Sequence, residues 1–233
     1  MKRWIQASGQ TIKQMTYAPE EEGGLEFTQF LASQGIIPSI GHSDAVYEQM
    51  EKAITAGASH ITHLFNGMRG IHHREAGVAG TALLRDELDV EVIADGIHID
   101  PAMVKLAWKT KGSERLILIT DSMRAKGLPD GDYELGGQKV VVDNGRATLE
   151  NGSLAGSVLS MNQAVKNIQR FTGCSLEEAI RMATVNPAKK LGIFERKGSI
   201  AAGKDADLVI LNKNGHVVLT LCKGQIAFEE RNQ

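Results

Sequence analysis

Short apolar runs alternate with amphipathic segments along most of the chain. Five runs have the length and β-branched content of strands: Ile12 to Ala18, Ile36 to Ile40, Ser59 to Phe65, Val90 to Ala94 and Leu116 to Thr120. The last run is continuously apolar from Leu116 to Ile119 rather than alternating, which is typical of a parallel strand that is covered on both faces. The pattern predicts an α/β fold built on a parallel sheet.

The segments between these runs carry helix signals. Apolar positions from Val46 to Ile54 recur at three- and four-residue spacing, and Gly57 ends that segment. Pro101 is suited to the first position of another helix, which we expect to stop near Gly112. Further helices are predicted over Leu25 to Ala32 and Val158 to Phe171, and at a capping box formed by Ser175 and Glu178.

The C-terminal part of the chain has a different character. Asp207 to Leu211 and Val217 to Cys222 are predicted to be short strands, because Asn-Lys-Asn-Gly between them is a hairpin signal. Tyr133 to Leu149, which is interrupted at Asp143-Asn144-Gly145, is also predicted to be a hairpin, inserted in a loop. We therefore expect residues 1–197 to form the α/β domain and residues 198–233 to form part of a small β domain.

Composition and charge exclude several kinds of partner. The 26 basic and 28 acidic residues give a net charge of −2, and no run rich in Lys or Arg provides a surface for nucleic acid or an anionic membrane. No apolar stretch approaches the ~20 residues that cross a bilayer, so we expect a cytoplasmic protein. Two cysteines, Cys174 and Cys222, are too few for a disulfide framework and are predicted to be buried free thiols.

Ionisable side chains follow four of the predicted strands. His42, His63, His98 and Asp121 each lie at a carboxyl-terminal strand end, the edge at which parallel barrels place their active sites. A single histidine in such a place is more often a core residue with a satisfied hydrogen bond, but four ionisable residues at consecutive strand ends favour a site. Neighbouring strand ends are close in space, so His42 and His63 can bind one metal at about 2.0–2.1 Å, with Asp121 beside it as a base.

Two loops could hold an anionic ligand that carries hydroxyl groups. Asn66 and Gly67 share a loop with the polar cluster His72-His73-Arg74-Glu75, and arginine offers forked donors to phosphate. The same cluster could instead be a solvated surface. The turn Leu154-Ala155-Gly156-Ser157 precedes a predicted helix and could add backbone N–H donors, although turns of small residues usually have no further role.

These motifs together carry a resemblance to a known family. The matching segments are Gly41-His42-Ser43-Asp44-Ala45, Thr62-His63-Leu64-Phe65-Asn66-Gly67-Met68, His72-His73-Arg74-Glu75, Ala94-Asp95-Gly96-Ile97-His98, Thr120-Asp121-Ser122-Met123, Leu154-Ala155-Gly156-Ser157 and Gly203-Lys204-Asp205-Ala206-Asp207-Leu208. From about Ile12 to its C-terminus the chain resembles the N-acetylglucosamine-6-phosphate deacetylases of the amidohydrolase superfamily. The resemblance implies part of a metal-dependent-hydrolase (β/α)₈ (TIM-like) barrel, about five of eight strands, and part of a small β-sandwich.

The resemblance also implies roles for individual residues. His42 and His63 match the two histidine metal ligands of the family, and Asp121 matches its catalytic aspartate. The positions that match its sugar-phosphate contacts are Asn66, Gly67, Arg74, His98, Leu154, Ala155 and Gly156. In the family the arginine reaches into the neighbouring subunit's site, so a homodimer is implied.

The reaction implied by the resemblance is hydrolysis of the N-acetyl group of N-acetylglucosamine 6-phosphate. A divalent ion, with zinc expected, lowers the pKa of a bound water towards ~7, and the hydroxide attacks the acetamide carbonyl. Asp121 takes the proton of the water and returns it to the amine leaving group.

One element of the family pattern has no counterpart in this sequence. Family members carry further residues ahead of the position that matches Ile12, among them a His-Leu-Glu-Gly-Pro-like segment whose Glu is the third metal ligand. The chain has no such segment, and Glu20 is the nearest carboxylate that could replace it. Zinc normally takes three protein ligands and a water, so two imidazoles predict a much reduced affinity.

Three readings of the function follow. The chain could be the C-terminal portion of a deacetylase that is active when the missing part is supplied. It could instead be an inactive or sugar-phosphate-binding fragment. An amidohydrolase acting on a cyclic amide or a nucleobase is disfavoured by the loop from Asn66 to Arg74.

Overall fold

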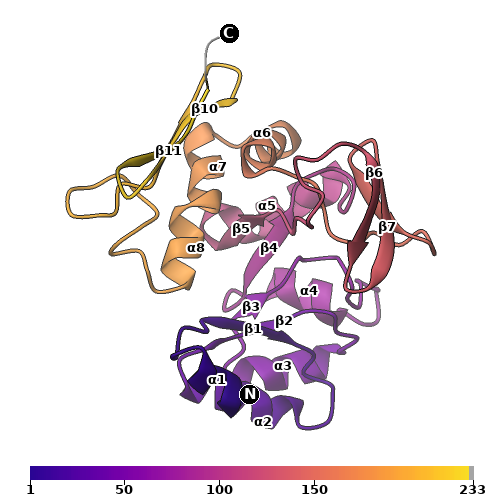
Figure 1. Ribbon diagram of the computed structural model, residues 1–233. Coiled ribbons are helices and arrows are strands. Elements are labelled where there is room, and N and C mark those ends of the chain that lie inside the picture. The colour runs from indigo at the N-terminus through magenta and orange to yellow at the C-terminus, as the bar shows by residue number, and fades with distance from the viewer. Residues whose placement is uncertain (231–233) are drawn as a thin grey trace. The chain divides into compact units, whose positions relative to one another are not determined.

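The computed structural model describes residues 1–230, which form two compact units (Figure 1). The first unit comprises residues 1–92 and 109–116, and the second comprises residues 93–108 together with the described residues from 117 onward. Among residues 1–230 no helix combines the length and the apolar content that crossing a membrane would require.

A parallel sheet follows the order of the chain. Its strands are β1 (Gln14–Tyr17), β2 (Ile37–Ile40), β3 (His60–Ile61), β4 (Asp89–Ile93) and β5 (Leu116–Ile119), in the order β1-β2-β3-β4-β5. In the first three pairings, Gln14 is opposite Ile37, Ser39 is opposite His60, and Ile61 is opposite Val90. The predicted parallel sheet is therefore confirmed; four strands lie within their predicted ranges, and β4 begins one residue earlier than predicted, at Asp89.

The third strand is much shorter than the pattern predicted. Ser59 to Phe65 was expected to be extended, but the strand ends at Ile61 because His63 and Phe65 have positive φ angles of 32° and 76°. A left-handed residue turns the chain out of the ladder. His63 consequently lies in the loop that leaves the strand end.

Four helices belong to the first unit: α1 (Lys2–Ala7), α2 (Gly24–Ser33), α3 (Tyr47–Thr55) and α4 (Gly77–Leu84). Figure 1 shows α2 and α3 along one side of strands β1 to β3. The sequence patterns predicted α2 and α3 but neither α1 nor α4. In α4 the apolar residues surround the helix instead of forming one stripe, and six of its eight residues are buried, so no amphipathic period was there to find.

The second unit contains an antiparallel sheet of β6 (Gly131–Leu135), β7 (Gln138–Asp143) and β8 (Arg146–Leu149). The turn predicted at Asp143-Asn144-Gly145 joins β7 to β8 as expected. A second turn at Gly136 and Gly137 adds a third strand to what was predicted as a hairpin. This sheet packs on a small apolar cluster that includes Met123, Ala147 and Ala155.

Three of the helical segments in the second half correspond to predicted signals, whereas α8 (Val185–Lys190) was not predicted. The helical segment α5 (Pro101–Arg115) is interrupted by Gly112, at φ 67° and ψ 178°, which is the predicted stop. Next come α6 (Met161–Thr172), α7 (Leu176–Ala183) and α8. The capping box of α7 is confirmed, because Ser175 N donates to Glu178 Oε2 at 2.8 Å and Glu178 N donates to Ser175 Oγ at 3.1 Å.

The last described elements form a second antiparallel sheet. Strands β9 (Leu208–Leu211) and β10 (Val217–Cys222) make the predicted hairpin, and β11 (Gln225–Glu229) pairs with the other edge of β10. Cys174 is buried as predicted, but Cys222 is exposed because it lies at the end of a strand in a sheet with little cover. The division at residues 197 and 198 stays a prediction.

Candidate active site

The two predicted metal-binding histidines lie side by side. His42 follows β2 and His63 follows β3, and their Nε2 atoms are 2.9 Å apart. The ring centroids are 4.6 Å apart and the ring planes are nearly perpendicular, at 85°. His42 is exposed, whereas His63 is only 7% exposed. Since β2 and β3 are paired in parallel, their carboxyl ends place the two loops together, as the sequence predicted.

The histidine pair has the geometry of two ligands to one metal ion. Two nitrogens at about 2.0–2.1 Å from a shared ion lie about 2.9 Å apart when the angle at the ion is near 90°, and about 3.3 Å apart at the tetrahedral angle. The observed separation therefore needs an opening of at most about 0.4 Å. Without metal, a single shared proton can bridge the two nitrogens as a hydrogen bond. The two histidines therefore fit two of the three protein ligands that zinc normally takes.

Residues 1–230 do not gather a third ligand beside the histidine pair. Within residues 1–230 no group of three or more His, Cys, Asp or Glu side chains could hold an ion. Both carboxylate oxygens of Glu20 accept short hydrogen bonds from the loop after His42: Oε2 from Ser43 Oγ at 2.6 Å, and Oε1 from Asp44 N at 2.5 Å. Glu20 is therefore engaged with that loop, and the idea that it replaces the missing ligand is not supported.

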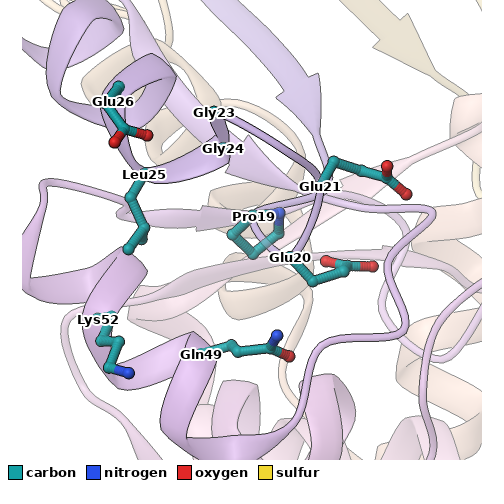
Figure 2. A pocket seen from close by; sticks show the side chains of 9 residues that line it. All are labelled: Pro19, Glu20, Glu21, Gly23, Gly24, Leu25, Glu26, Gln49 and Lys52. Carbon is teal, nitrogen blue, oxygen red and sulfur yellow. The ribbon is translucent and has the colours of Figure 1, made fainter.

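Glu20 also lines a pocket at the end of β1. The pocket has a volume of about 270 Å³, and its wall includes Glu21, Glu26, Gln49 and Lys52. Figure 2 shows the Glu20 carboxylate pointing away from Glu26 and Lys52.

Gly67 packs directly against His42. It has a φ of 54°, and a Cβ built on it would lie 3.0 Å from Nδ1 of His42, so only glycine fits there without moving the ring. The neighbouring Asn66 turns its amide back on its own loop, where Nδ2 donates to the carbonyl oxygens of His63 and Leu64 at 3.2 Å each. Both predicted sugar-binding residues of this loop thus lie next to the histidine pair.

Arg74 lies in an exposed loop of the same unit. Its Nη1 is 2.7 Å from Nε2 of His73, and its backbone N donates to Nδ1 of His72 at 3.2 Å. The adjacent Glu75 ties this loop to α3, because its Oε1 accepts from Tyr47 N at 2.7 Å and from Gly77 N at 2.9 Å. The hydrogen bonds from Gly77 and Tyr47 hold the pKa of Glu75 below its usual value.

His98 is oriented by Asp95 in the second unit. Asp95 Oδ2 lies 2.6 Å from Nδ1 of His98, and its Oδ1 accepts from the backbone N–H groups of Ile97 and His98 at 2.8 Å each. Burial raises the pKa of Asp95, but these hydrogen bonds together outweigh it and leave the pKa below its usual value. An ionised Asp95 favours the His98 tautomer with the proton on Nδ1, which leaves Nε2 for another partner.

Asp121 lies two residues beyond β5, with an exposed side chain and a φ of 46°. Its carbonyl oxygen accepts from Ser157 N at 2.8 Å, and Met123 N donates to Ser157 O at 2.9 Å. Gly156, at φ 67°, packs so tightly here that a Cβ would lie 3.0 Å from the Asp121 carbonyl oxygen. The turn Leu154-Ala155-Gly156 is therefore held next to Asp121 by these hydrogen bonds and by the packing of Gly156.

Two backbone donors of the segment Leu154-Ala155-Gly156-Ser157 already have partners. Ala155 N donates to Ala147 O at 3.0 Å, and Ser157 N donates to Asp121 O. The helix predicted to begin at Val158 starts at Met161, so the turn lies ahead of the first helical turn and not in it.

The predicted site residues thus form two groups, one in each unit. His42, His63, Asn66 and Gly67 gather in the first unit, and Asp121 lies beside Gly156 in the second. That Asp121 and His98 converge on the histidine pair stays a prediction.

Backbone conformation marks the same residues independently. Seven non-glycine residues of the described chain have a positive φ, and His42, His63, Phe65 and Asp121 are four of them. Such conformations cost about 1–3 kcal/mol and persist where the surrounding structure imposes them, often at functional sites. This supports a functional role for these three strand ends.

The sequence interpretation missed Glu91, which lies in β4. Its Oε2 accepts from His63 N at 3.3 Å, and its Oε1 accepts from Gln14 Nε2 at 3.1 Å. His60 Nε2 is 3.4 Å from the same Oε1. The signal that could have found this polar cluster is the one charged residue within the apolar run Val90 to Ala94.

Comparison with known proteins gives the family. The model of the amidohydrolase family matches residues 34–227. The chain belongs to the amidohydrolase family, and its five parallel strands are part of the (β/α)₈ barrel that the sequence predicted.

Several of its relatives share a more specific name. An N-acetylglucosamine-6-phosphate deacetylase from Bacillus subtilis is 52% identical over 227 residues, covering 97% of this chain and 57% of the relative. A crystal structure of that enzyme from Thermotoga maritima is 42% identical with a TM-score of 0.89, covering 94% of this chain and 60% of that one.

An aspartate-to-alanine variant of the deacetylase from Mycobacterium smegmatis, solved in complex with N-acetyl-D-glucosamine-6-phosphate, is 38% identical with a TM-score of 0.92. It covers 97% of this chain and 60% of that structure. The chain thus spans less than two thirds of the length of the relatives it matches.

Proposed function

We propose that this chain carries the histidine and aspartate part of a deacetylase for N-acetylglucosamine 6-phosphate, and that the relatives' remaining length supplies the rest of the site. The observation that carries the proposal is the 2.9 Å separation of the Nε2 atoms of His42 and His63. Its support is the name that three of the relatives share, at 52%, 42% and 38% identity.

In this proposal His42 and His63 hold a divalent ion, with zinc as the expected one. Amidohydrolases generally use a divalent metal. When bound, the ion lowers the pKa of a water molecule and polarises the substrate carbonyl. The third ligand comes from the His-Leu-Glu-Gly-Pro-like segment of the family, which this sequence does not contain.

The other residues move protons and hold the sugar. Asp121 accepts a proton from the water that adds to the acetamide carbonyl carbon, and donates it to the nitrogen as the C–N bond breaks, giving acetate and an amine. The tautomer that Asp95 imposes lets His98 Nε2 contact the substrate. The remaining sugar-phosphate contacts in the proposal are Asn66, Gly67, Arg74, Leu154, Ala155 and Gly156.

Arg74 has a separate place in the proposal. Its exposed loop is attached to α3 through Glu75, so that the guanidinium can reach away from its own chain. We propose a homodimer in which Arg74 binds the phosphate in the neighbouring site, as the family resemblance implies.

Acetate release from N-acetylglucosamine 6-phosphate, with zinc added, tests the proposal. The chain is assayed alone and together with the segment of a relative that bears the His-Leu-Glu-Gly-Pro-like motif. We expect turnover in the mixture, and its loss by about 10²–10⁴-fold in Asp121→Asn. Asp132→Asn, in an exposed ion pair with Lys139, serves as the control and should leave the rate unchanged.

The outcomes separate the possible functions. No turnover in the mixture contradicts the proposal. Heat of substrate binding in calorimetry without acetate release would identify a sugar-phosphate-binding fragment instead.

A further inference from the structure

We propose that Glu20 is a positioning residue for His42: it holds the loop of residues 42–45 so that the His42 ring meets His63. This inference deepens the proposed function, on which it rests, because it concerns the same histidine pair. Glu20 lies three residues beyond β1, and His42 lies two residues beyond β2, the neighbouring parallel strand.

The contacts of Glu20 act on the two residues that directly follow His42. Ser43 Oγ donates to Oε2 at 2.6 Å, and Asp44 N donates to Oε1 at 2.5 Å. Ser43 is 2% exposed, and its Oγ also accepts from Ala45 N at 3.2 Å. One carboxylate thus satisfies a buried hydroxyl and a backbone donor in the same loop, and hydrogen bonds to a charged acceptor are stronger than those between neutral groups.

Arg69 holds the same loop from the other side. Its Nη2 lies 2.6 Å from Asp44 Oδ2, its Nε donates to Asp44 O at 2.7 Å, and its backbone N donates to Ser43 O at 3.0 Å. The loop after His42 therefore lies between an anion from the end of β1 and a cation from the loop that carries Gly67. Opposite charges on the two sides leave the loop little freedom to shift.

The conformation of His42 explains why such support is needed. Its φ of 51° is a left-handed conformation that a histidine adopts only when its surroundings impose it. Gly41 before it packs against the side chains of Thr16 and Thr62, where a Cβ would lie 2.9 and 2.8 Å from their carbon atoms. Packing thus restrains the backbone at Gly41, before His42, and Glu20 restrains it at Ser43 and Asp44, after His42.

Alternative roles of Glu20 make different predictions for its variants. In Glu20→Ala both hydrogen bonds to the loop are lost. In Glu20→Gln both contacts can still form, with the one to Ser43 reversed, since the amide oxygen can accept from Asp44 N and the amide nitrogen can donate to Ser43 Oγ. A metal ligand would be lost in both variants, because an amide is a poor replacement for a carboxylate. Glu21→Ala is the matched control, an adjacent exposed carboxylate in the same pocket.

The first measurement uses the metal-free 233-residue chain and follows backbone amide hydrogen exchange by nuclear magnetic resonance. We expect the Asp44 amide to exchange at least about tenfold faster in Glu20→Ala, with Ile61 and Val92 amides unchanged. Glu20→Gln and Glu21→Ala should resemble the parent chain. An Asp44 amide that is equally protected in Glu20→Ala, or equally exposed in Glu21→Ala, overturns the proposal.

The second measurement is the zinc affinity of the same variants by calorimetry. Loss of a group that supports a metal-binding histidine typically costs about 10–100-fold, so Glu20→Ala should weaken zinc binding by that factor. Glu20→Gln should stay within about threefold of the parent, and an equal loss in both variants would make Glu20 a ligand and overturn the positioning role.

Unfolding of a variant and failure of the proposed deacetylation can each be distinguished from loss of the positioning role. Should Glu20→Ala lose protection throughout the chain, Glu20→Asp replaces it, because its side chain is one methylene too short to keep both contacts. Hydrogen exchange requires neither zinc nor turnover, so the measurement on the Asp44 amide tests the positioning role even if the chain catalyses no deacetylation.

Discussion

The Nε2 atoms of His42 and His63 lie 2.9 Å apart although the two residues are 21 positions apart in the chain. Their loops leave adjacent parallel strands, and both residues have positive φ angles, 51° and 32°. Two histidines that face each other at this separation have a geometry suited to sharing one proton or, after a small opening, one metal ion. The first two predictions concern this pair.

Replacing either histidine should abolish most of the zinc affinity of the chain. We expect His42→Ala and His63→Ala to weaken zinc binding by about a hundredfold or more, since even the loss of a group that only supports a ligand costs about 10–100-fold. Calorimetric titration with zinc measures the effect. His73→Ala, in the exposed loop beside Arg74, is the control and should bind zinc like the parent chain. Equal losses in all three variants would contradict a site at the pair.

Gly67 should tolerate no side chain. In Gly67→Ala the methyl group would lie 3.0 Å from His42 Nδ1, and the φ of 54° would cost a non-glycine residue about 1–2 kcal/mol. We therefore expect a lower free energy of unfolding in urea and a weaker zinc affinity together. Gly70→Ala is the control, because that glycine has open space and no positive φ. A Gly67→Ala protein as stable as Gly70→Ala would show that the His42 ring is free to move.

The capping box of α7 should contribute measurably to stability. Ser175→Ala removes the acceptor of Glu178 N, which should lower the free energy of unfolding by about 1 kcal/mol. Ser160 occupies the N-cap of α6 without a side-chain capping hydrogen bond, so Ser160→Ala should cost less than about 0.5 kcal/mol. Urea unfolding of both variants checks the difference, and equal costs would argue against the capping box.

Tyr17 should ionise at a higher pH than an ordinary tyrosine. Burial raises its pKa to about 12, against a smaller opposing effect of its hydrogen bond with Thr28 Oγ1 at 2.5 Å. Since the pKa is higher in the folded than in the unfolded chain, the stabilisation is complete below pH 10 and is lost as the pH rises from 10 through 12.

Tyrosinate absorbance during an alkaline titration measures this shift. The parent chain should show one late component among its three tyrosines, and Tyr17→Phe should lack it. A titration of Tyr17→Phe that keeps the late component would assign the shift to another tyrosine.

Much of the fold was predictable from local patterns. The parallel strands were found because apolar runs such as Leu116 to Ile119 are continuous, and Gly112 and Ser175 marked a helix end and a helix start through their own backbone preferences. Helix α4 was not predictable in this way. Its sequence Gly-Val-Ala-Gly-Thr-Ala-Leu-Leu has no polar face, so only its burial in the tertiary structure made it a helix.

The candidate site divides in the same manner. The residue types at the strand ends, His42, His63, His98 and Asp121, were the basis for predicting metal chemistry, because four ionisable side chains at consecutive strand ends favour a site over separate structural roles. The role of Glu20 was not visible, since a carboxylate beside a loop is equally consistent with a ligand and with a hydrogen-bond acceptor. Its contacts with Ser43 and Asp44 depend on the pairing of β1 with β2.

The sequence by itself determined the five parallel strands, several of the helices and the chemical groups at the strand ends, because local hydrophobic periods and residue types are properties of neighbouring positions. Only the tertiary structure decided that the Nε2 atoms of His42 and His63 lie 2.9 Å apart and that Glu20 accepts hydrogen bonds from the loop that follows His42. Such distances depend on strand register and on backbone conformations that surrounding contacts impose, and these involve residues far apart in the chain.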